Sequence, residues 1–416
     1  MSANGSAQFT FAKGNAAKVA ALPRYAAGRV RTRFRRRNRA LWAFGSGFGP
    51  ADGALALLLA ARRLHPGLRL VWLAGNAEQA RTAQSLGIEW AAKESRRGFE
   101  LTASAGVVTI THGFGDVNRY AVGGGTIAQL WHGSPLKKLH ADSPAALSLG
   151  RLNRVGAART VMRQAYRRGT RGIGLLPVAA DLFVPFMCSA FDLTPQQVRV
   201  LGEPRTDVLF RGSPSGRRAA ARELLERQVP GLGGRRAVLY APTWRDGEPD
   251  PGVPTQRQWR RIDAWCAATE SVLLVRPHPL GVGSYQHGSR HVHLVSPAAL
   301  PESMPLLWGV DVLITDYSSM MFDFAVTGGP VVFLAPDLEH YAATRGLYLD
   351  YSTVSGGRWQ QDWDGVVDVL EHLDADSSAH ERATRHSAAL TAMAHRHTDG
   401  RSAERVAGYL LDLSGS

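Results

Sequence analysis

Short apolar runs alternate with helix-like segments through most of this chain. The strand-like runs cover residues 41–44, 68–73, 107–110, 127–131, 175–178 and 198–201, and then 237–240, 272–275, 291–295, 310–315 and 331–334. Strands that alternate with helices form parallel sheets with helices on both faces. The pattern therefore predicts an α/β protein that contains two parallel sheets.

A polar segment with a Gly-Leu-Gly-Gly break, within residues 213–236, separates the two series. We expect a basic N-terminal arm at residues 1–40, a first Rossmann-like domain at 41–212 and a second at 213–416, which ends in helices. A chain of 416 residues is long enough for two separate cores. Two such domains enclose a cleft, and ligands bind there at the carboxyl ends of strands.

The composition indicates a folded protein in a reducing, cytoplasmic compartment. Hydrophobic residues make up 44% of the chain, which excludes general disorder. The two cysteines, Cys188 and Cys266, form no disulfide or ligand pattern. The longest apolar run, residues 54–61, is too short to cross a bilayer, and the N-terminus lacks the apolar core of a secretory signal.

The net charge of +14 is concentrated in two segments. No acidic residue precedes Asp52, although lysine and arginine are frequent there, and residues 143–180 are also free of acids. In the second segment Arg159, Arg163 and Arg167 share one helical face. Such segments attract polyanions, and we expect an anionic membrane surface and no nucleic acid, because no nucleic-acid-binding motif accompanies them. A solvated arm and a solvated helix face are the alternative.

The segment DVLITDYSSMMFD, residues 311–323, is the strongest candidate for a binding site. A buried-strand pattern ends at Ser318 and Ser319, and a segment with helical spacing follows. The free N–H groups and the positive dipole end at such a junction bind anions, phosphate above all. The alternative is that the two serines only cap the helix.

Two histidines follow directly on expected strands. His132 lies in WHGSPLKK, where its imidazole can take a proton from a hydroxyl group near neutral pH. Gly133 and Ser134 next to it allow backbone amides to approach an anion. His278 lies in RPHP, where it and Arg276 can donate hydrogen bonds to phosphate oxygens. A histidine packed in a tight turn is the alternative for His132.

Two further turns at strand ends carry an arginine, which is Arg205 in GEPRTD and Arg245 in APTWR. Together with the histidine turns and the serine pair, they predict a ligand rich in phosphate. The glycine-rich segments 45–50 and 123–126 match neither a dinucleotide fingerprint nor a P-loop. We find no pattern of metal ligands and expect no metal ion and no cofactor.

The motifs WHGSPLKKLH, GEPRTD, LYAPTWRD, RPH and DVLITDYSSMMFDF occur in this order. They resemble the motifs of the CDP-glycerol glycerophosphotransferases, the primases and polymerases of teichoic acid, over residues 41–350. The resemblance implies a GT-B fold, in which two Rossmann-like domains with parallel sheets face a central cleft. It implies that the first domain binds the acceptor and the second the nucleotide donor, and that the protein is peripheral at the cytoplasmic face of the cell membrane.

The resemblance also implies roles for individual residues. His132 would be the general base that deprotonates the acceptor hydroxyl, and His278 with Arg276 would steady the diphosphate and the departing CMP. Ser318 and Ser319 would hold phosphate oxygens, and Asp323 would accept a hydrogen bond from a donor hydroxyl. The other donor-binding candidates are Gly133, Ser134, Pro135, Arg205, Pro242 and Thr243.

The expected reaction moves a polyol phosphate, with glycerol phosphate as first choice, from a CDP-polyol to a hydroxyl of a lipid-linked or polymer acceptor. It releases CMP in the synthesis of teichoic acid or a capsular polymer. The alternative within the same fold is a glycosyltransferase that uses a nucleotide sugar. A non-catalytic binder of membrane or nucleic acid is a third interpretation, and it predicts steep salt dependence without nucleotide binding.

Overall fold

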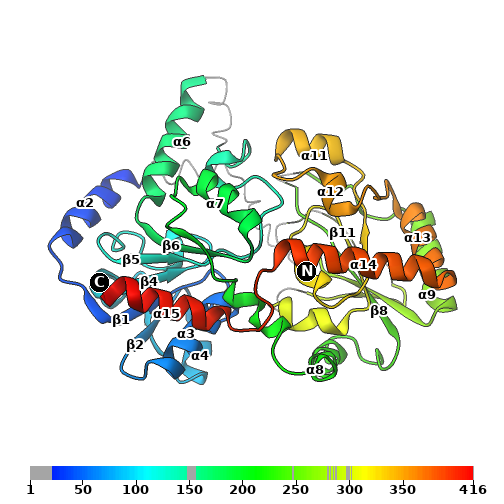
Figure 1. Cartoon of the computed structure of the whole chain (residues 1–416), viewed down its shortest axis with the longest axis horizontal. Coiled ribbons are helices and arrows are strands. Elements are labelled where there is room, and N and C mark those ends of the chain that lie inside the picture. The colour runs from blue at the N-terminus through cyan, green and yellow to red at the C-terminus, as the bar shows by residue number, and fades with distance from the viewer. Residues whose placement is uncertain are drawn as a thin grey trace, which may run out of the picture.

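The computed structural model describes residues 21–147, 156–245, 248–278, 281, 283, 285, 288–296, 300 and 302–415. Two α/β domains lie side by side, each around its own parallel sheet (Figure 1). The predicted fold class is therefore confirmed. Most of the predicted basic arm, residues 1–20, lies outside the described residues, whereas its last part forms helix α2 (Leu22–Arg33).

The first domain contains a seven-stranded sheet with the order β3-β2-β1-β4-β5-β6-β7. Its strands are β1 (Asn38–Phe44), β2 (Arg69–Ala74), β3 (Glu89–Ala92), β4 (Ala105–Ile110), β5 (Thr126–Gln129), β6 (Ile173–Val178) and β7 (Val198–Val200). Its helices are α2, α3 (Asp52–Leu64), α4 (Ala77–Ser85), α5 (Arg96–Ser104), α6 (Gly156–Thr170) and α7 (Val184–Phe191), with short 3-10 turns η1 (Phe114–Asp116), η2 (His140–Asp142), η4 (Asp181–Phe183) and η5 (Pro204–Leu209). The strand order reverses between β1 and β4, and a ligand crevice forms at such a point.

The second domain contains a five-stranded sheet with the order β10-β9-β8-β11-β12. Its strands are β8 (Arg236–Ala241), β9 (Ser271–Val275), β10 (Val292–Leu294), β11 (Val312–Thr315) and β12 (Val331–Phe333). Its helices are α8 (Pro214–Glu226), α9 (Gln256–Ala268), η6 (Met304–Gly309), α10 (Met320–Ala325), α11 (Leu338–Thr344), α12 (Tyr351–Ser355), α13 (Trp363–Ala375) and α14 (Ser377–Ala394). The order reverses between β8 and β11, so the serine pair after β11 lies at the second crevice.

The central strands are buried on both faces, which explains their continuous apolar sequences. All six residues of β4 are buried, as are the four residues of β11. Strands of a parallel sheet read this way because helices cover both sides. The edge strand β3, with the sequence EWAA, is short and partly exposed, and the apolar pattern did not predict it.

The last helix, α15 (Ser402–Gly415), returns to the first domain and lies next to α3 (Figure 1). Val406, Ala407 and Leu410 are fully buried in the same core as Trp42 and Trp72. The Asp207 carboxylate, on η5 of the first domain, accepts hydrogen bonds from the N–H groups of residues 402 (2.8 Å) and 403 (2.9 Å) at the start of the helix. The prediction that residues 213–416 form one domain is therefore wrong for α15.

Candidate active site

A cavity of about 2790 Å³ lies between the two domains and reaches the carboxyl ends of strands in both sheets. Residues of the predicted site that line it are His132, Arg205, Pro242, Arg276, His278, Ser318, Ser319 and Asp323. Gly133, Ser134, Pro135 and Thr243 lie behind this lining, and all four are buried. The structure thus brings the two histidines and the serine pair to one cavity.

His132 follows β5 through a sharp turn. Trp131 adopts a φ of +58°, which is uncommon for an aromatic residue, and redirects the chain after the strand. The Nδ1 atom of His132 lies 3.3 Å from the backbone oxygen of Thr111. A carbonyl oxygen can only accept, so Nδ1 carries the hydrogen and Nε2 keeps its lone pair. This tautomer can take a proton from a hydroxyl group in the cavity.

The surroundings of His132 keep its ring neutral. Burial lowers the pKa of His132 to about 3, the neighbouring His112, Arg205 and Lys137 add to the shift, and the Thr111 carbonyl opposes it. The ring is nevertheless partly exposed to the water of the cavity, which weakens the influence of burial and of the neighbouring charges on its pKa. At neutral pH the imidazole is unprotonated, as a general base must be.

His278 lies at the end of β9 on the second domain. Its ring stacks on Trp244 with a centroid separation of 5.8 Å. Burial lowers the pKa of His278 to about 4, and the cations Lys137 and Arg345 lower it further. Arg276, two residues earlier, donates a hydrogen bond of 2.6 Å to the Leu300 carbonyl and faces the same cavity.

Lys137 and Arg345 come together because the two domains share a short backbone bridge. Lys137 pairs with Leu347 in antiparallel fashion, and the N–H of Lys138 donates to the Gly346 carbonyl at 2.9 Å. Burial lowers the pKa of Lys137 to about 8, and Arg345 is the next largest cause. Two cations beside His278 therefore form a region of the cavity that suits a diphosphate.

Arg205, which was predicted to contact the donor, is held by two carboxylates of the protein. Its Nη1 and Nη2 atoms donate to the two Asp323 oxygens at 2.9 and 3.0 Å, and its Nε donates to Glu203 at 2.7 Å. Arg205 is 7% exposed and Asp323 is 1% exposed. Each Asp323 oxygen accepts one of these hydrogen bonds and keeps a second lone pair, and Asp323 lines the cavity, so its role as acceptor for a donor hydroxyl stays a prediction. The pair links η5 of the first domain to α10 of the second.

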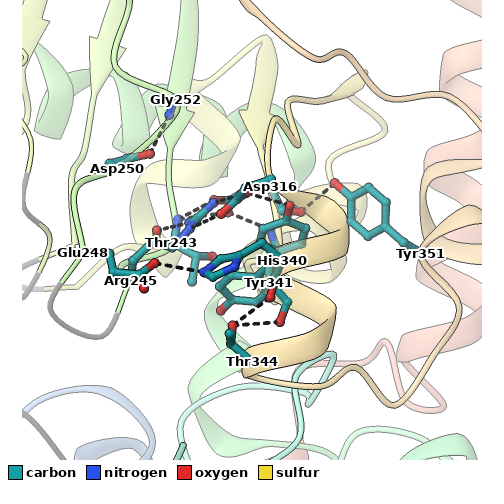
Figure 2. Close-up of polar contacts among 12 residues, drawn as sticks. Thr243, Arg245, Glu248, Asp250, Gly252, Asp316, His340, Tyr341, Thr344 and Tyr351 are labelled. Carbon is teal, nitrogen blue, oxygen red and sulfur yellow. Dashed lines mark hydrogen bonds and ion pairs between the residues drawn. The ribbon is translucent and has the colours of Figure 1, made fainter.

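Arg245 is also committed to the protein, in a buried network at the ends of β8 and β11 (Figure 2). It donates to Asp316 at 2.7 Å and, through Nε and Nη2, to Asp337 at 2.9 and 2.8 Å. The N–H of Thr243 donates to Asp316 at 2.9 Å. Arg245 is therefore paired with carboxylates of the protein, and the Thr243 N–H is paired with Asp316, while the donor contact of Thr243 stays a prediction.

The serine pair begins helix α10, which is only six residues long. The Ser318 hydroxyl accepts a hydrogen bond of 3.3 Å from the N–H of Met320, whereas the Ser319 side chain does not cap the helix. Ser319 instead faces Gly133 across the domain interface, where an added Cβ on Gly133 would lie 2.6 Å from the serine hydroxyl. A helix this short has a weak dipole, so hydroxyl groups and nearby cations would do most of the anion binding.

The family model for CDP-Glycerol:Poly(glycerophosphate) glycerophosphotransferase matches residues 26–412. This chain belongs to that family. The teichoic acid ribitol-phosphate polymerase TarL of Staphylococcus aureus (strain NCTC 8325 / PS 47) is 30% identical over 200 residues, which are 47% of this chain and 35% of TarL. The teichoic acid glycerol-phosphate transferase of the same organism is 27% identical over 268 residues, which are 62% of this chain and 64% of the relative.

The fold of this glycerophosphotransferase-family chain is that of the wall teichoic acid polymerase TagF, with a TM-score of 0.72 and 19% identity over 97% of both chains. The likeness confirms the predicted GT-B architecture. Both sequence matches span less than two thirds of the relative's own length.

The cavity lining also contains residues that were not predicted as site residues, among them His112, Lys137 and Arg345. His112 lies two residues after the end of strand β4, so the rule that led to His132 and His278 would also have pointed to it. Lys137 lies within the WHGSPLKK motif and could have been chosen for its charge. Arg345 carried no signal, because only the bridge between the domains brings it to Lys137.

Proposed function

We propose that this protein transfers a polyol phosphate from a CDP-polyol to a hydroxyl group of a teichoic-acid-type acceptor and releases CMP. The observation that carries the proposal is that one cavity holds both a neutral imidazole with a free Nε2 and a cluster of cations. Membership of the glycerophosphotransferase family supports phosphate transfer over transfer of a sugar. A structure of TagF after a soak with CDPG is among the structures that resemble this chain.

The proposed reaction begins when the acceptor hydroxyl gives its proton to Nε2 of His132. The acceptor oxygen attacks the phosphorus that carries the polyol. The bond from this phosphorus to the bridging oxygen breaks, and its electron pair leaves with CMP. Lys137, Arg345, Arg276 and His278 would stabilise the charge that develops on the departing phosphate. Ser318 and Ser319 would donate hydrogen bonds to its oxygens.

The test is incubation with CDP-glycerol, CDP-ribitol and a nucleotide sugar, each with a polyol-phosphate acceptor, followed by analysis of the released nucleotide. Release of CMP from a CDP-polyol supports the proposal. Release of a nucleoside diphosphate from the nucleotide sugar alone would refute it and favour the glycosyltransferase. The His132→Ala variant should lose CMP release by a factor of about 100 or more while its circular dichroism spectrum is unchanged.

We further propose that the protein works at the cytoplasmic face of the membrane, on a lipid-linked or polymer acceptor. Within the described part of the chain, every helix is too short or too polar to span a bilayer. Helix α2 and the residue after its end expose Val30 (67%) and Phe34 (85%) beside arginines, and α6 exposes Val161 (67%). Apolar tips among cations suit the surface of an anionic bilayer.

Arg37 is not part of the proposed membrane-binding segment. Its guanidinium donates to the backbone oxygens of Thr102 at 2.6 Å and Ala105 at 3.2 Å, so it belongs to the domain and not to a free arm. The exposed Arg35 and Arg36 are the better test. The double change Arg35→Glu and Arg36→Glu should weaken sedimentation with phosphatidylglycerol vesicles at least tenfold, because each cation contributes about 1 kcal/mol at such a surface. Arg227→Glu on α8 is the matched control, and equal losses in both variants would refute this role.

A further inference from the structure

Thr111 anchors two imidazole rings at the end of β4. The Nδ1 atom of His132 lies 3.3 Å from its backbone oxygen, and the Nδ1 atom of His112 lies 2.8 Å from its Oγ1. The two rings stack with their centroids 4.5 Å apart and their planes 14° from parallel. Because both Nδ1 atoms face Thr111, the Nε2 atom of each ring lies on the side of that ring away from Thr111.

Other contacts hold this pair of rings in place. The Asp116 carboxylate accepts hydrogen bonds from the N–H groups of Thr111 at 2.9 Å and His112 at 2.7 Å. The Thr111 hydroxyl lies 2.9 Å from the hydroxyl of Ser46, which follows β1. The edge of the Phe48 ring packs on His112 at a centroid distance of 4.5 Å.

The stack lies at a place where a ligand is expected. The loops after β1 and β4 flank the point at which the strand order of the first sheet reverses. His112 and His132 both line the cavity, together with Phe48 and Asp52. The two stacked rings are therefore both open to whatever enters this end of the cleft.

The charges around His112 differ from those around His278 and His132, since the cation Lys137 acts on both of the latter rings. The charged side chains that act on His112 are the carboxylates of Asp116 and Asp52. The backbone N–H of Asp52 in turn donates to Glu302 at 2.8 Å, so a further acid lies beside it. The cations that act on His278 are Lys137 and Arg345. Acids repel phosphate but accept hydrogen bonds from hydroxyl groups, so this end suits a neutral polyol.

We propose that His112 and His132 together bind two adjacent hydroxyl groups at the end of the acceptor polyol. His132 takes the proton of the attacking hydroxyl, while Nε2 of His112 forms a hydrogen bond with the neighbouring one. His112 is thus an acceptor-binding residue that selects a vicinal diol and positions the attacking oxygen for proton transfer to His132. This inference rests on the proposed polyol-phosphate transfer.

The test compares two acceptors that differ in one hydroxyl group. One ends in glycerol phosphate, and the other ends in 1,3-propanediol phosphate, which lacks the neighbouring hydroxyl. The unaltered protein should prefer the diol by about tenfold in kcat/KM, the effect expected for one hydrogen bond between neutral groups. In His112→Phe, which keeps a stacked ring and removes both nitrogens, this preference should fall to about one. The KM for the CDP-polyol should not change.

A second variant separates lost binding from lost structure. His112→Gln keeps a hydrogen-bonding group and should restore part of the preference for the diol, and thermal unfolding checks that both variants fold. If the variants lose rate equally on the two acceptors, or if the unaltered protein shows no preference, the role of His112 is refuted while the proposed function stands. If the unaltered protein releases no CMP from any CDP-polyol, the proposed function itself fails.

Discussion

Arg205 and Asp323 join the two domains through a bidentate ion pair with N–O distances of 2.9 and 3.0 Å at the edge of the cleft. Both side chains are buried, so removal of one partner leaves an uncompensated charge away from water. Asp323→Ala should therefore lower the free energy of unfolding by about 3–5 kcal/mol in a urea titration. Glu223→Ala breaks an exposed pair with Arg227 and should cost less than about 1 kcal/mol. Equal losses in the two variants would show that the interdomain pair is not buried in solution.

On the acid side, the pH dependence of kcat/KM should reflect the protonation of His132. Its pKa is lowered from the usual 6.5, so the ring stays neutral through the physiological range and becomes protonated only in more acidic solution. Protonation removes the base, and kcat/KM should fall as the pH falls, with an apparent pKa below 6.5. A limb with an apparent pKa at or above 7 would contradict the described surroundings of His132.

Stability should also fall on the acid side. Since the pKa of His132 and of His278 is lower in the folded protein than in the unfolded chain, the unfolded chain binds protons first as the pH drops below 6.5. The free energy of unfolding should decrease from pH 6.5 towards pH 4, and this decrease should be shallower in the double variant His132→Gln, His278→Gln. Urea titrations at several pH values measure both slopes, and parallel slopes would contradict the prediction.

On the alkaline side, the pH dependence of kcat/KM should reflect the deprotonation of Lys137, whose pKa is lowered to about 8. Above this pH the amine loses the charge that would bind the diphosphate, so kcat/KM for the CDP-polyol should decline. Lys137→Arg keeps a positive charge and should remove the alkaline limb, whereas Lys138→Arg should leave it in place. A limb that persists in Lys137→Arg must come from another group.

Gly133 lies close to Ser319 of the second domain at the cleft. Its φ is +153°, and an added Cβ would approach the Ser319 hydroxyl to 2.6 Å. Gly133→Ala should lower the free energy of unfolding by about 1–3 kcal/mol and slow the transfer reaction. Gly67→Ala, where an added Cβ meets nothing within 4 Å, is the matched control and should be close to neutral. Unaltered kinetics in Gly133→Ala would show that the domains separate more widely in solution.

Helix α15 offers a test of the first domain's core. Leu410 is fully buried there, and Leu413 on the same helix is 37% exposed. Leu410→Ala should lower the free energy of unfolding by about 2–5 kcal/mol, and Leu413→Ala by much less. Urea titration measures both. Similar small changes would mean that α15 is not docked on the first domain.

The fold was predictable because burial on both faces of each sheet leaves continuous apolar runs in the sequence. Residues 237–240 and 272–275 fall within β8 and β9 for this reason. The position of α15 was not predictable in the same way. Its amphipathic pattern indicates that one face of the helix is buried, but not against which elements. Those elements are α3, β4 and β5, which are far away in sequence.

The site was predictable where a residue's backbone position decides its place. His132 and His278 each follow a strand, and ligands bind at the carboxyl ends of strands, so both were expected at the cavity that they line. The same rule did not predict that Arg205 and Arg245 pair with Asp323, Asp316 and Asp337, because these carboxylates come from other parts of the chain. A strand-end arginine can bind a ligand or a carboxylate, and only the tertiary structure decides which.

The return of α15 to the first domain has a consequence for synthesis on the ribosome. The core around Trp42 and Leu57 includes Leu410, which is translated more than three hundred residues later. The first sheet therefore leaves the exit tunnel with only part of this core covered, by α3 and not yet by α15. The core is completed only after the whole second domain has been translated. Until then, the exposed apolar residues are a binding site for chaperones.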